Sequence, residues 1–222
     1  MIVLAVDTST LQAGVAIWRN ERVLASRQRI VTTHSDALLV MIDEAFADAG
    51  VIPADVDAIA CGAGPGSFTG LRIGLSTAKG LCFALDKPLV MISSLAALAA
   101  RAPDGRVCAT LDAFKGEVYA GIFTVAAGVP TVDGIEAVLP PAQLLPRLAD
   151  VAFIVGSGAA KYPELVAAPA RLLDEHPGPR PADVARLAAI RVARGDLDDL
   201  SRASPTYIRP SEAELVKKAR PQ

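Results

Sequence analysis

The sequence predicts an α/β fold of two lobes, each a mixed sheet flanked by helices. Three observations lead to this prediction. Short apolar runs alternate with longer segments in which apolar residues recur every three or four positions, which is typical of strands that alternate with helices. This order begins twice along the 222 residues of the chain. A hydrophobic content of 52% supplies enough apolar side chains for a full core.

Residues 1–103 are predicted to form the first lobe. Its first three strands form an antiparallel meander, because the apolar runs are separated by short polar turns. The first helix is amphipathic and ends at Gly50, a residue type that commonly stops helices. The expected strands cover 2–8, 13–18, 23–30, 56–60 and 89–92, and the expected helices cover 35–50 and 67–85.

Residues 104–203 are predicted to form the second lobe, and we expect residues 204–222 to pack back on the first. The segment 167–181 holds several prolines and no apolar period, which indicates a connecting loop. The expected strands of this lobe cover 106–111, 117–125 and 152–155, and the expected helices cover 140–148 and 182–194.

Composition and charge exclude several classes of protein. A net charge of −2 gives no general attraction to nucleic acid. Cys61, Cys82 and Cys108 lie in apolar surroundings, which indicates reduced core thiols rather than disulfides or a zinc site. No signal peptide is evident, and no apolar stretch approaches the roughly 20 residues that span a bilayer. We therefore expect a cytoplasmic protein without membrane contact.

A glycine-rich run over residues 61–74, CGAGPGSFTGLRIG, joins a predicted strand to a predicted helix. Glycines at such a junction expose backbone N–H groups at the helix entrance. A phosphate or another protein could dock there. The spacing matches neither a dinucleotide-binding fingerprint nor a P-loop, so neighbouring residues must decide between these ligands.

The helix after this run carries small residues beside its apolar stripe. For each single residue, core statistics favour burial against its own sheet. The alternative is a helix–helix interface with another chain, to which Val40 and Met41 would add exposed apolar area. On that hypothesis, Ser76→Arg or Gly74→Trp abolishes complex formation and leaves the fold intact. The candidate interface residues are His34, Leu38, Met41, Gly66, Phe68, Thr69, Gly70, Arg72, Ile73, Gly74 and Thr77.

Four segments, 2–10, 34–42, 64–74 and 205–209, resemble the TsaB family, also called YeaZ. The resemblance covers essentially the whole chain. It implies a two-lobed fold of the actin/Hsp70/sugar-kinase type. It also implies a non-catalytic partner in the bacterial machinery that places threonylcarbamoyl on N6 of the adenosine beside the anticodon, in tRNAs that read codons beginning with A.

The same resemblance implies several partners. They are the homologous catalytic subunit TsaD, which the chain binds and activates, and the ATPase TsaE. The chain would form a homodimer when alone and would meet tRNA only through the complex. TsaD-like proteins carry a metal-binding His-x-x-x-His, and both histidines are missing from the corresponding stretch 92–98. Only His34 and His176 occur elsewhere, so we expect no catalytic residue and no metal.

Asp7, Thr8 and Ser9 end the first predicted strand, where related nucleotide-binding folds keep a phosphate or magnesium loop. They are the candidate cofactor-binding residues. The alternative, which we favour, is a hairpin turn with side-chain to backbone hydrogen bonds. A glycine turn at 156–160 is a second candidate phosphate element, and equally a simple turn.

Two other classes of function remain to be weighed against the partner subunit. A free-standing ATP-dependent phosphotransferase would use Asp7 and the glycine turns. The weakness of this hypothesis is the missing catalytic base. Separately, Asp112 and Glu117 could pair as acid and base across a turn, although an exposed hairpin with Lys115 explains them equally well. A peptidase would need a nucleophile with a base, or a metal, and neither is visible. We expect that the chain alone needs no cofactor and that ATP or ADP with Mg²⁺ belongs to the interface with the partner.

Overall fold

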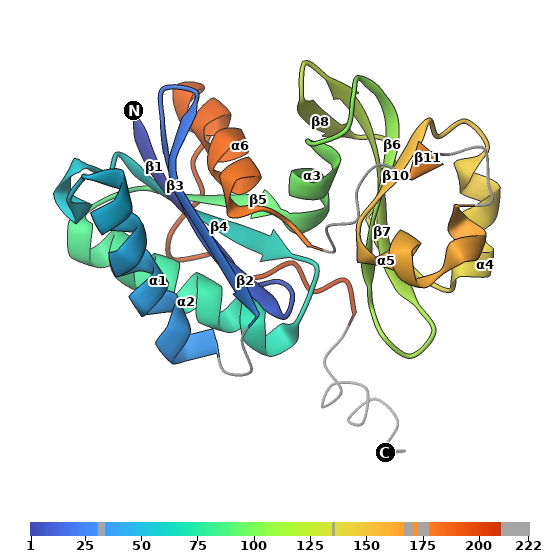
Figure 1. The fold of residues 1–222 in the computed structure, drawn as a ribbon, viewed down its shortest axis with the longest axis horizontal. Helices are drawn as coiled ribbons and strands as arrows, with labels where there is room; N and C mark the ends of the chain where they lie inside the picture. Colours follow the sequence, from blue (N-terminus) through green and yellow to red (C-terminus); the bar gives the residue numbers. More distant parts are fainter. Residues whose placement is uncertain (31–33, 135, 167–170, 173–177, 210–222) are drawn as a thin grey trace.

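The computed structural model describes residues 1–30, 34–134, 136–166, 171–172 and 178–209, and it shows two lobes, each built on one sheet (Figure 1). The first sheet has the strand order β3-β2-β1-β4-β5. The first three strands are the predicted antiparallel meander, and β4 and β5 run parallel to β1. Their bounds are β1 Ile2–Asp7, β2 Gln12–Arg19, β3 Arg22–Ile30, β4 Ala58–Gly64 and β5 Leu89–Ser93.

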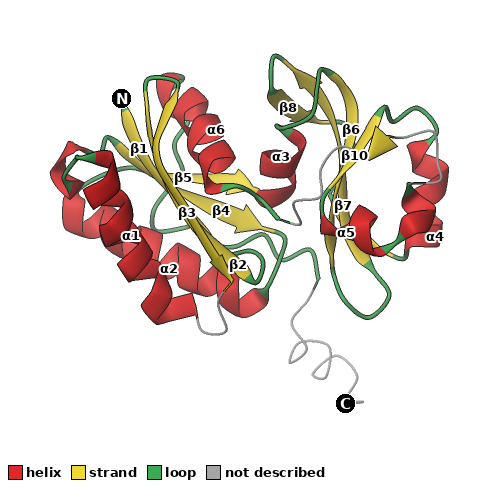
Figure 2. Cartoon of the chain, viewed as in Figure 1, coloured by secondary structure: helices red, strands yellow, loops and turns green. Residues whose placement is uncertain are grey.

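Helices cover both faces of the first sheet (Figure 2). Because side chains alternate along a strand, Leu4 and Val6 of β1 face one helical layer, and Val3 and Ala5 face the other. The first layer consists of α1 (His34–Ala49) and α2 (Phe68–Leu85), with the short turn η1 (Pro53–Asp55) between them in sequence. The second layer consists of α3 (Ser94–Ala99) and α6 (Pro181–Ala193).

The second sheet has the order β11-β10-β6-β7-β8, with β9 also paired to β7. Helix α3 packs against it as well, through Leu95 and Leu98, and so connects the two lobes. The elements of this lobe are β6 Gly105–Asp112, β7 Val118–Ala126, β8 Val129–Val132, β9 Ala137–Leu139, α4 Pro141–Leu144, η2 Leu145–Leu148, β10 Phe153–Val155, α5 Ser157–Lys161, η3 Pro163–Leu165 and β11 Arg171–Leu172.

The position of helix α6 differs from the predicted division of the chain into lobes. We expected it in the second lobe, but it packs on the first sheet, with Val184 and Ala188 in one cluster with Val3 and Ala60. Small side chains on both surfaces allow this close packing, and nothing in the helix itself specifies which sheet it meets. Within the predicted loop 167–181, residues 171–172 form β11.

Of the tail 204–222, the first six residues lie in the described part. There the Thr206 N–H donates to the Ala63 carbonyl oxygen at 2.8 Å, which places this segment against the first lobe. Residues 210–222 lie outside the described residues.

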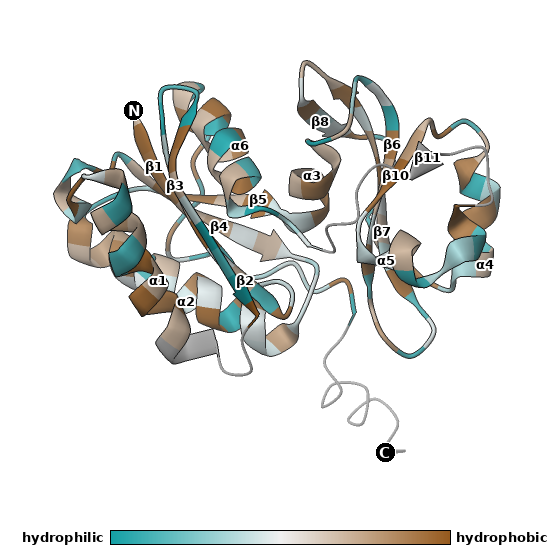
Figure 3. Cartoon of the chain, viewed as in Figure 1, coloured by the Kyte–Doolittle hydropathy of each residue, from teal (hydrophilic) through white to brown (hydrophobic). Residues whose placement is uncertain are grey.

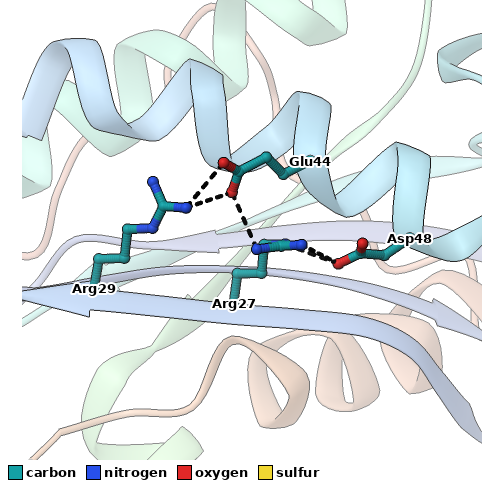
Figure 4. A network of polar contacts seen from close by, with 4 residues as sticks. All are labelled: Arg27, Arg29, Glu44 and Asp48. Carbon is teal, nitrogen blue, oxygen red and sulfur yellow. Dashed lines mark hydrogen bonds and ion pairs between the residues drawn. The ribbon is translucent and has the colours of Figure 1, made fainter.

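Helix α1 is tied to the edge strand β3 by charged side chains (Figure 4). Arg27 donates to Asp48 at 2.8 Å, and Arg29 donates to Glu44 at 2.9 Å. Glu44 also lies 3.2 Å from Arg27, so it joins both pairs. Figure 3 shows hydrophilic colour along this edge strand, whose outer residues are exposed. Polar side chains of this kind discourage another chain from adding to the sheet edge.

Candidate partner interface

The glycine-rich run packs against the end of β1. A Cβ atom at Gly62 would overlap the Asp7 carboxylate, and a Cβ atom at Gly66 or Gly70 would overlap a backbone carbonyl oxygen of residues 8–9. The Ser67 N–H donates to the Ser9 carbonyl oxygen at 2.7 Å. The run therefore uses its glycines to approach its own chain.

Asp7, Thr8 and Ser9 are each about 1% exposed, and their side-chain oxygens form hydrogen bonds within the chain. The backbone N–H and the hydroxyl of Ser9 donate to Asp7 Oδ1 at 2.9 and 2.6 Å, and Ser94 Oγ donates to Asp7 Oδ2 at 3.2 Å. Burial raises the pKa of Asp7, although the hydrogen bonds from Ser9 and Ser94 oppose this. The structure shows a hairpin turn with side-chain to backbone hydrogen bonds between β1 and β2. The candidate cofactor-binding role of these three residues stays a prediction.

The glycine turn of the second lobe is closed in a similar way. A Cβ atom at Gly156, whose φ is +98°, would overlap the Thr110 carbonyl oxygen. The Ala159 N–H donates to Thr110 Oγ1 at 2.9 Å, and Thr110 Oγ1 donates to the Val155 carbonyl oxygen at 3.0 Å. The glycines at this turn serve close packing.

Asp112 and Glu117 form ion pairs with two different basic side chains. Lys161 donates to Asp112 at 2.7 Å, and Arg209 pairs with Glu117. This pairing favours structural roles over an acid–base pair.

One face of α2 points away from the core. Its exposed positions recur every three or four residues, as expected for one side of a helix. Phe83 is 88% exposed, and no atom of the described residues lies within 4 Å of where a Cβ of Gly80 would be. We call this surface the α2 outward face; it consists of Thr69, Arg72, Ser76, Gly80 and Phe83.

The structure corrects several candidate interface residues on α2 and before it. Gly70 and Gly74 are buried, and a Cβ at Gly74 would overlap the Thr8 hydroxyl, so Gly74→Trp would damage the fold rather than test an interface. Gly66 is half-buried against Ser9. Ile73 and Thr77 are half-buried at the border of the α2 outward face.

Helix α1 also differs from the expectation. Leu38 and Met41 are fully buried, because the helical period turns both toward the sheet. Leu39 and Val40 are the exposed apolar residues there, at 54% and 50%. The side chain of His34 lies outside the described residues. The exposed apolar area of α1 therefore comes from Leu39 and Val40, not from Met41.

Three side chains stack at the N-terminal end of α2. The Arg72 guanidinium carbon lies 3.9 Å from the centre of the Phe68 ring, and Arg72 Nε donates to the Tyr207 hydroxyl at 3.0 Å. The rings of Phe68 and Tyr207 are 5.0 Å apart. Sequence reasoning placed Phe68 and Arg72 at the interface but missed Tyr207. The presence of Tyr207 in the family-like segment 205–209 was the available signal.

The cysteines are free and buried, as expected for core thiols. Burial raises the pKa of Cys82 to about 11 and that of Cys108 to about 12, so both remain protonated thiols at neutral pH. Among the residues with described positions, His, Cys, Asp and Glu form no cluster that could hold a metal ion. None of the described helices has the length and apolar character of a membrane span.

The chain is similar in sequence to a known family model and to named bacterial proteins. The family model "TsaD: tRNA N6-adenosine threonylcarbamoyltransferase" matches residues 27–177. The Escherichia coli K12 protein named tRNA threonylcarbamoyladenosine biosynthesis protein TsaB is 32% identical over 223 residues, which cover 96% of each chain. The Haemophilus influenzae protein of that name is 39% identical over 181 residues, covering 73% of this chain and 74% of the relative.

Solved structures show the same fold. YeaZ from Pseudomonas aeruginosa is 37% identical, with a TM-score of 0.79 over 93% of this chain and 100% of that one. An activator of 2-hydroxyisocaproyl-CoA dehydratase from Clostridium difficile shares the fold alone, with 10% identity and a TM-score of 0.52 over 90% of this chain and 99% of that one. The two sheets with their flanking helices thus form the same mixed α/β fold as the YeaZ structure. The chain belongs to the TsaB (YeaZ) family.

Proposed function

We propose that this chain is a non-catalytic partner subunit in the biosynthesis of tRNA threonylcarbamoyladenosine. Its curated relatives carry this pathway in their names, and one of them aligns over 96% of both chains. The match to the TsaD family model supports a catalytic partner of related fold. In this proposal, the chain binds a TsaD-type subunit and, together with a TsaE-type ATPase, holds it active.

The exposed surface of the two neighbouring helices carries the proposal. Phe83 on α2 and Leu39 and Val40 on α1 are large apolar side chains that contact with another protein would remove from water. Between Arg72 and Phe83, the α2 outward face has only small residues at 76 and 80, so another helix can approach closely. This surface favours a helical face of a partner as its ligand.

Activation follows from differential binding. If the chain binds the active conformation of the catalytic subunit more tightly than the inactive one, the population shifts toward the active form. The size of the effect is limited by that difference in affinity. No reacting group from this chain is needed.

The same face also supports pairing of two copies when no partner is present, because an identical surface on both copies can form a two-fold interface. tRNA would then contact the complex mainly through other subunits, since the chain has a net charge of −2. The proposal places the protein in the cytoplasm with its tRNA substrate.

The proposal assigns no cofactor to the chain alone and leaves ATP or ADP with Mg²⁺ to the interface with the partner. The residues that would hold a phosphate in the first lobe are buried and bonded to one another. This does not favour the alternative function, a free-standing ATP-dependent phosphotransferase. Titration calorimetry of the chain with ATP and Mg²⁺ separates the two, because the phosphotransferase must bind nucleotide and turn it over without a partner.

The proposed function is tested by threonylcarbamoyl transfer to tRNA with purified TsaD-type and TsaE-type proteins, with and without this chain. Sizing chromatography of the same mixtures follows the complex. We expect transfer that depends on the chain and a chain that elutes with the TsaD-type subunit. Full transfer without the chain, or absence of a complex with a folded chain, would contradict the proposal.

A further inference from the structure

The last described residues, 205–209, cross from one lobe to the other. We call this segment the strap. Figure 1 shows the red end of the chain passing between the two lobes before the grey trace begins. On the first lobe, the Thr206 N–H donates to the Ala63 carbonyl oxygen, and the Tyr207 hydroxyl accepts the bond from Arg72.

The other end of the strap contacts the second lobe. Arg209 donates to the Ala113 carbonyl oxygen at 2.6 Å and pairs with the Glu117 carboxylate. The Arg209 guanidinium carbon also lies 5.9 Å from the Tyr119 ring. Residues 113 and 117 form the turn between β6 and β7, where the Ala113 N–H donates to the Glu117 carbonyl oxygen at 3.0 Å.

The two contacts cannot move independently. Tyr207 and Arg209 are two residues apart, so the chain between their Cα atoms spans at most roughly 7 Å. A large displacement of Tyr207 therefore also displaces the backbone at Arg209. A cavity of about 410 Å³, lined by Ala63, Ser93 and Thr206 among others, lies beside the strap and leaves room for the strap to move.

Other contacts join the lobes without involving the strap. Arg186 of α6 donates to the Gly128 carbonyl oxygen at 2.7 Å, and Ser93 donates to Glu136. These contacts would keep the lobes together if the strap were released. Releasing the strap would therefore change how firmly the lobes are held without separating them.

We infer that the strap couples the α2 outward face to the contact between the lobes. Arg72 belongs to that face and donates a hydrogen bond to Tyr207. A protein that binds Arg72 would therefore weaken or strengthen this bond, and through the strap it would affect the contact of Arg209 with the turn 113–117. This inference deepens the proposed function and rests on it for the identity of the protein that binds. The coupling itself belongs to the free chain and is reciprocal.

Hydrogen exchange of the free chain tests the coupling, because exchange rates report local opening. Tyr207→Phe removes the hydroxyl that Arg72 binds and lies in the first-lobe half of the strap. We expect it to speed exchange of the Ala113 and Glu117 amides in the other lobe by about 3-fold or more, since a lost hydrogen bond of ordinary strength allows a change of this order.

The reciprocal variant is Arg209→Ala, which should speed exchange of the Thr206 amide by a similar factor. Arg202→Ala is the control, because its side chain is 89% exposed and lies before the strap. Faster exchange in the opposite lobe for both strap variants, and in neither lobe for the control, supports the inference. Changes confined to the lobe of each substitution overturn it. Since no partner is present, a failure to bind a TsaD-type subunit would count against the proposed function alone.

Discussion

Thr8 and Gly70 interlock at the centre of the first lobe. The Thr8 hydroxyl donates to the Gly70 carbonyl oxygen at 2.7 Å, while a Cβ atom on Gly70 would overlap the Thr8 carbonyl oxygen. Helix α2 can therefore lie against the end of β1 only with glycine at this position. This contact fixes which side of α2 faces β1 and therefore which side faces outward.

Two alanine substitutions in α2 should have opposite effects on stability. Gly70→Ala should lower the free energy of unfolding by about 2 kcal/mol or more, because the backbone at Thr8 must move. Gly80→Ala should raise it by about 0.5–1 kcal/mol, since no described neighbour would come within 4 Å of the new Cβ at this helical position. Urea denaturation of both variants measures the difference. Equal effects would mean that α2 does not pack as described.

The buried carboxyl of Asp7 should make stability depend on pH. Burial raises its folded pKa, so the folded state holds the proton at pH values where the unfolded state has lost it. The Asp7 contribution to stability is therefore fully present below the ordinary aspartate pKa and is lost as pH rises through the folded pKa.

Asp7→Asn should remove this dependence. The difference in unfolding free energy, wild type minus variant, should fall as pH rises across that window. A difference that is flat or that rises with pH would show that the hydrogen bonds from Ser9 and Ser94 outweigh burial.

The charged network on α1 should contribute little and depend on salt. Glu44→Gln weakens the pairs with Arg27 and Arg29, all of them at least a third exposed, and should cost less than about 1 kcal/mol at low salt. The cost should shrink in 1 M NaCl, because salt screens exposed charges. Thermal unfolding at both salt concentrations checks this, with the exposed Glu164→Gln as the control. A loss that persists at high salt would indicate a packing role for Glu44.

Phe83 should dominate self-association of the chain. Phe83→Ser removes a large apolar contact and should weaken any homodimer by about 10-fold or more, since buried aromatic anchors carry much of the binding energy at interfaces. The fold should be unaffected, because the side chain is 88% exposed. Sedimentation velocity measures the dissociation constant, and Phe114→Ser, at another exposed phenylalanine, is the control. An effect of equal size in both variants would remove Phe83 from the interface.

The sequence predicted α1 and α2 well because both have a clear apolar period. It did not reveal which small residues of α2 face inward. Glycines occur on both sides of this helix, and only the position of β1 distinguishes Gly70 and Gly74 from Gly80. The burial of Met41 was predictable from helical spacing, since it falls on the same side as Leu38 and Ile42.

Long-range placements were harder to predict. Helix α6 has an alanine-rich face that suits either sheet, so its packing on the first sheet depends on the complete fold. Tyr207 meets Arg72 across 135 residues of sequence, and no local pattern specifies such a pair. The short elements α3, α5, β8 and β9 were missed because so few residues show no period.

Binding of a TsaD-type subunit to the Ser76→Arg variant shows whether the α2 outward face is the partner interface. Residue 76 is exposed at the middle of the α2 outward face, so a long charged side chain should block a close helix–helix contact without disturbing the fold. Thr131→Arg, on exposed strand β8, is the matched control. We expect titration calorimetry to detect binding for wild type and Thr131→Arg and at least 10-fold weaker binding for Ser76→Arg, on the order of 1.4 kcal/mol. Unchanged binding of a folded Ser76→Arg protein would contradict this expectation.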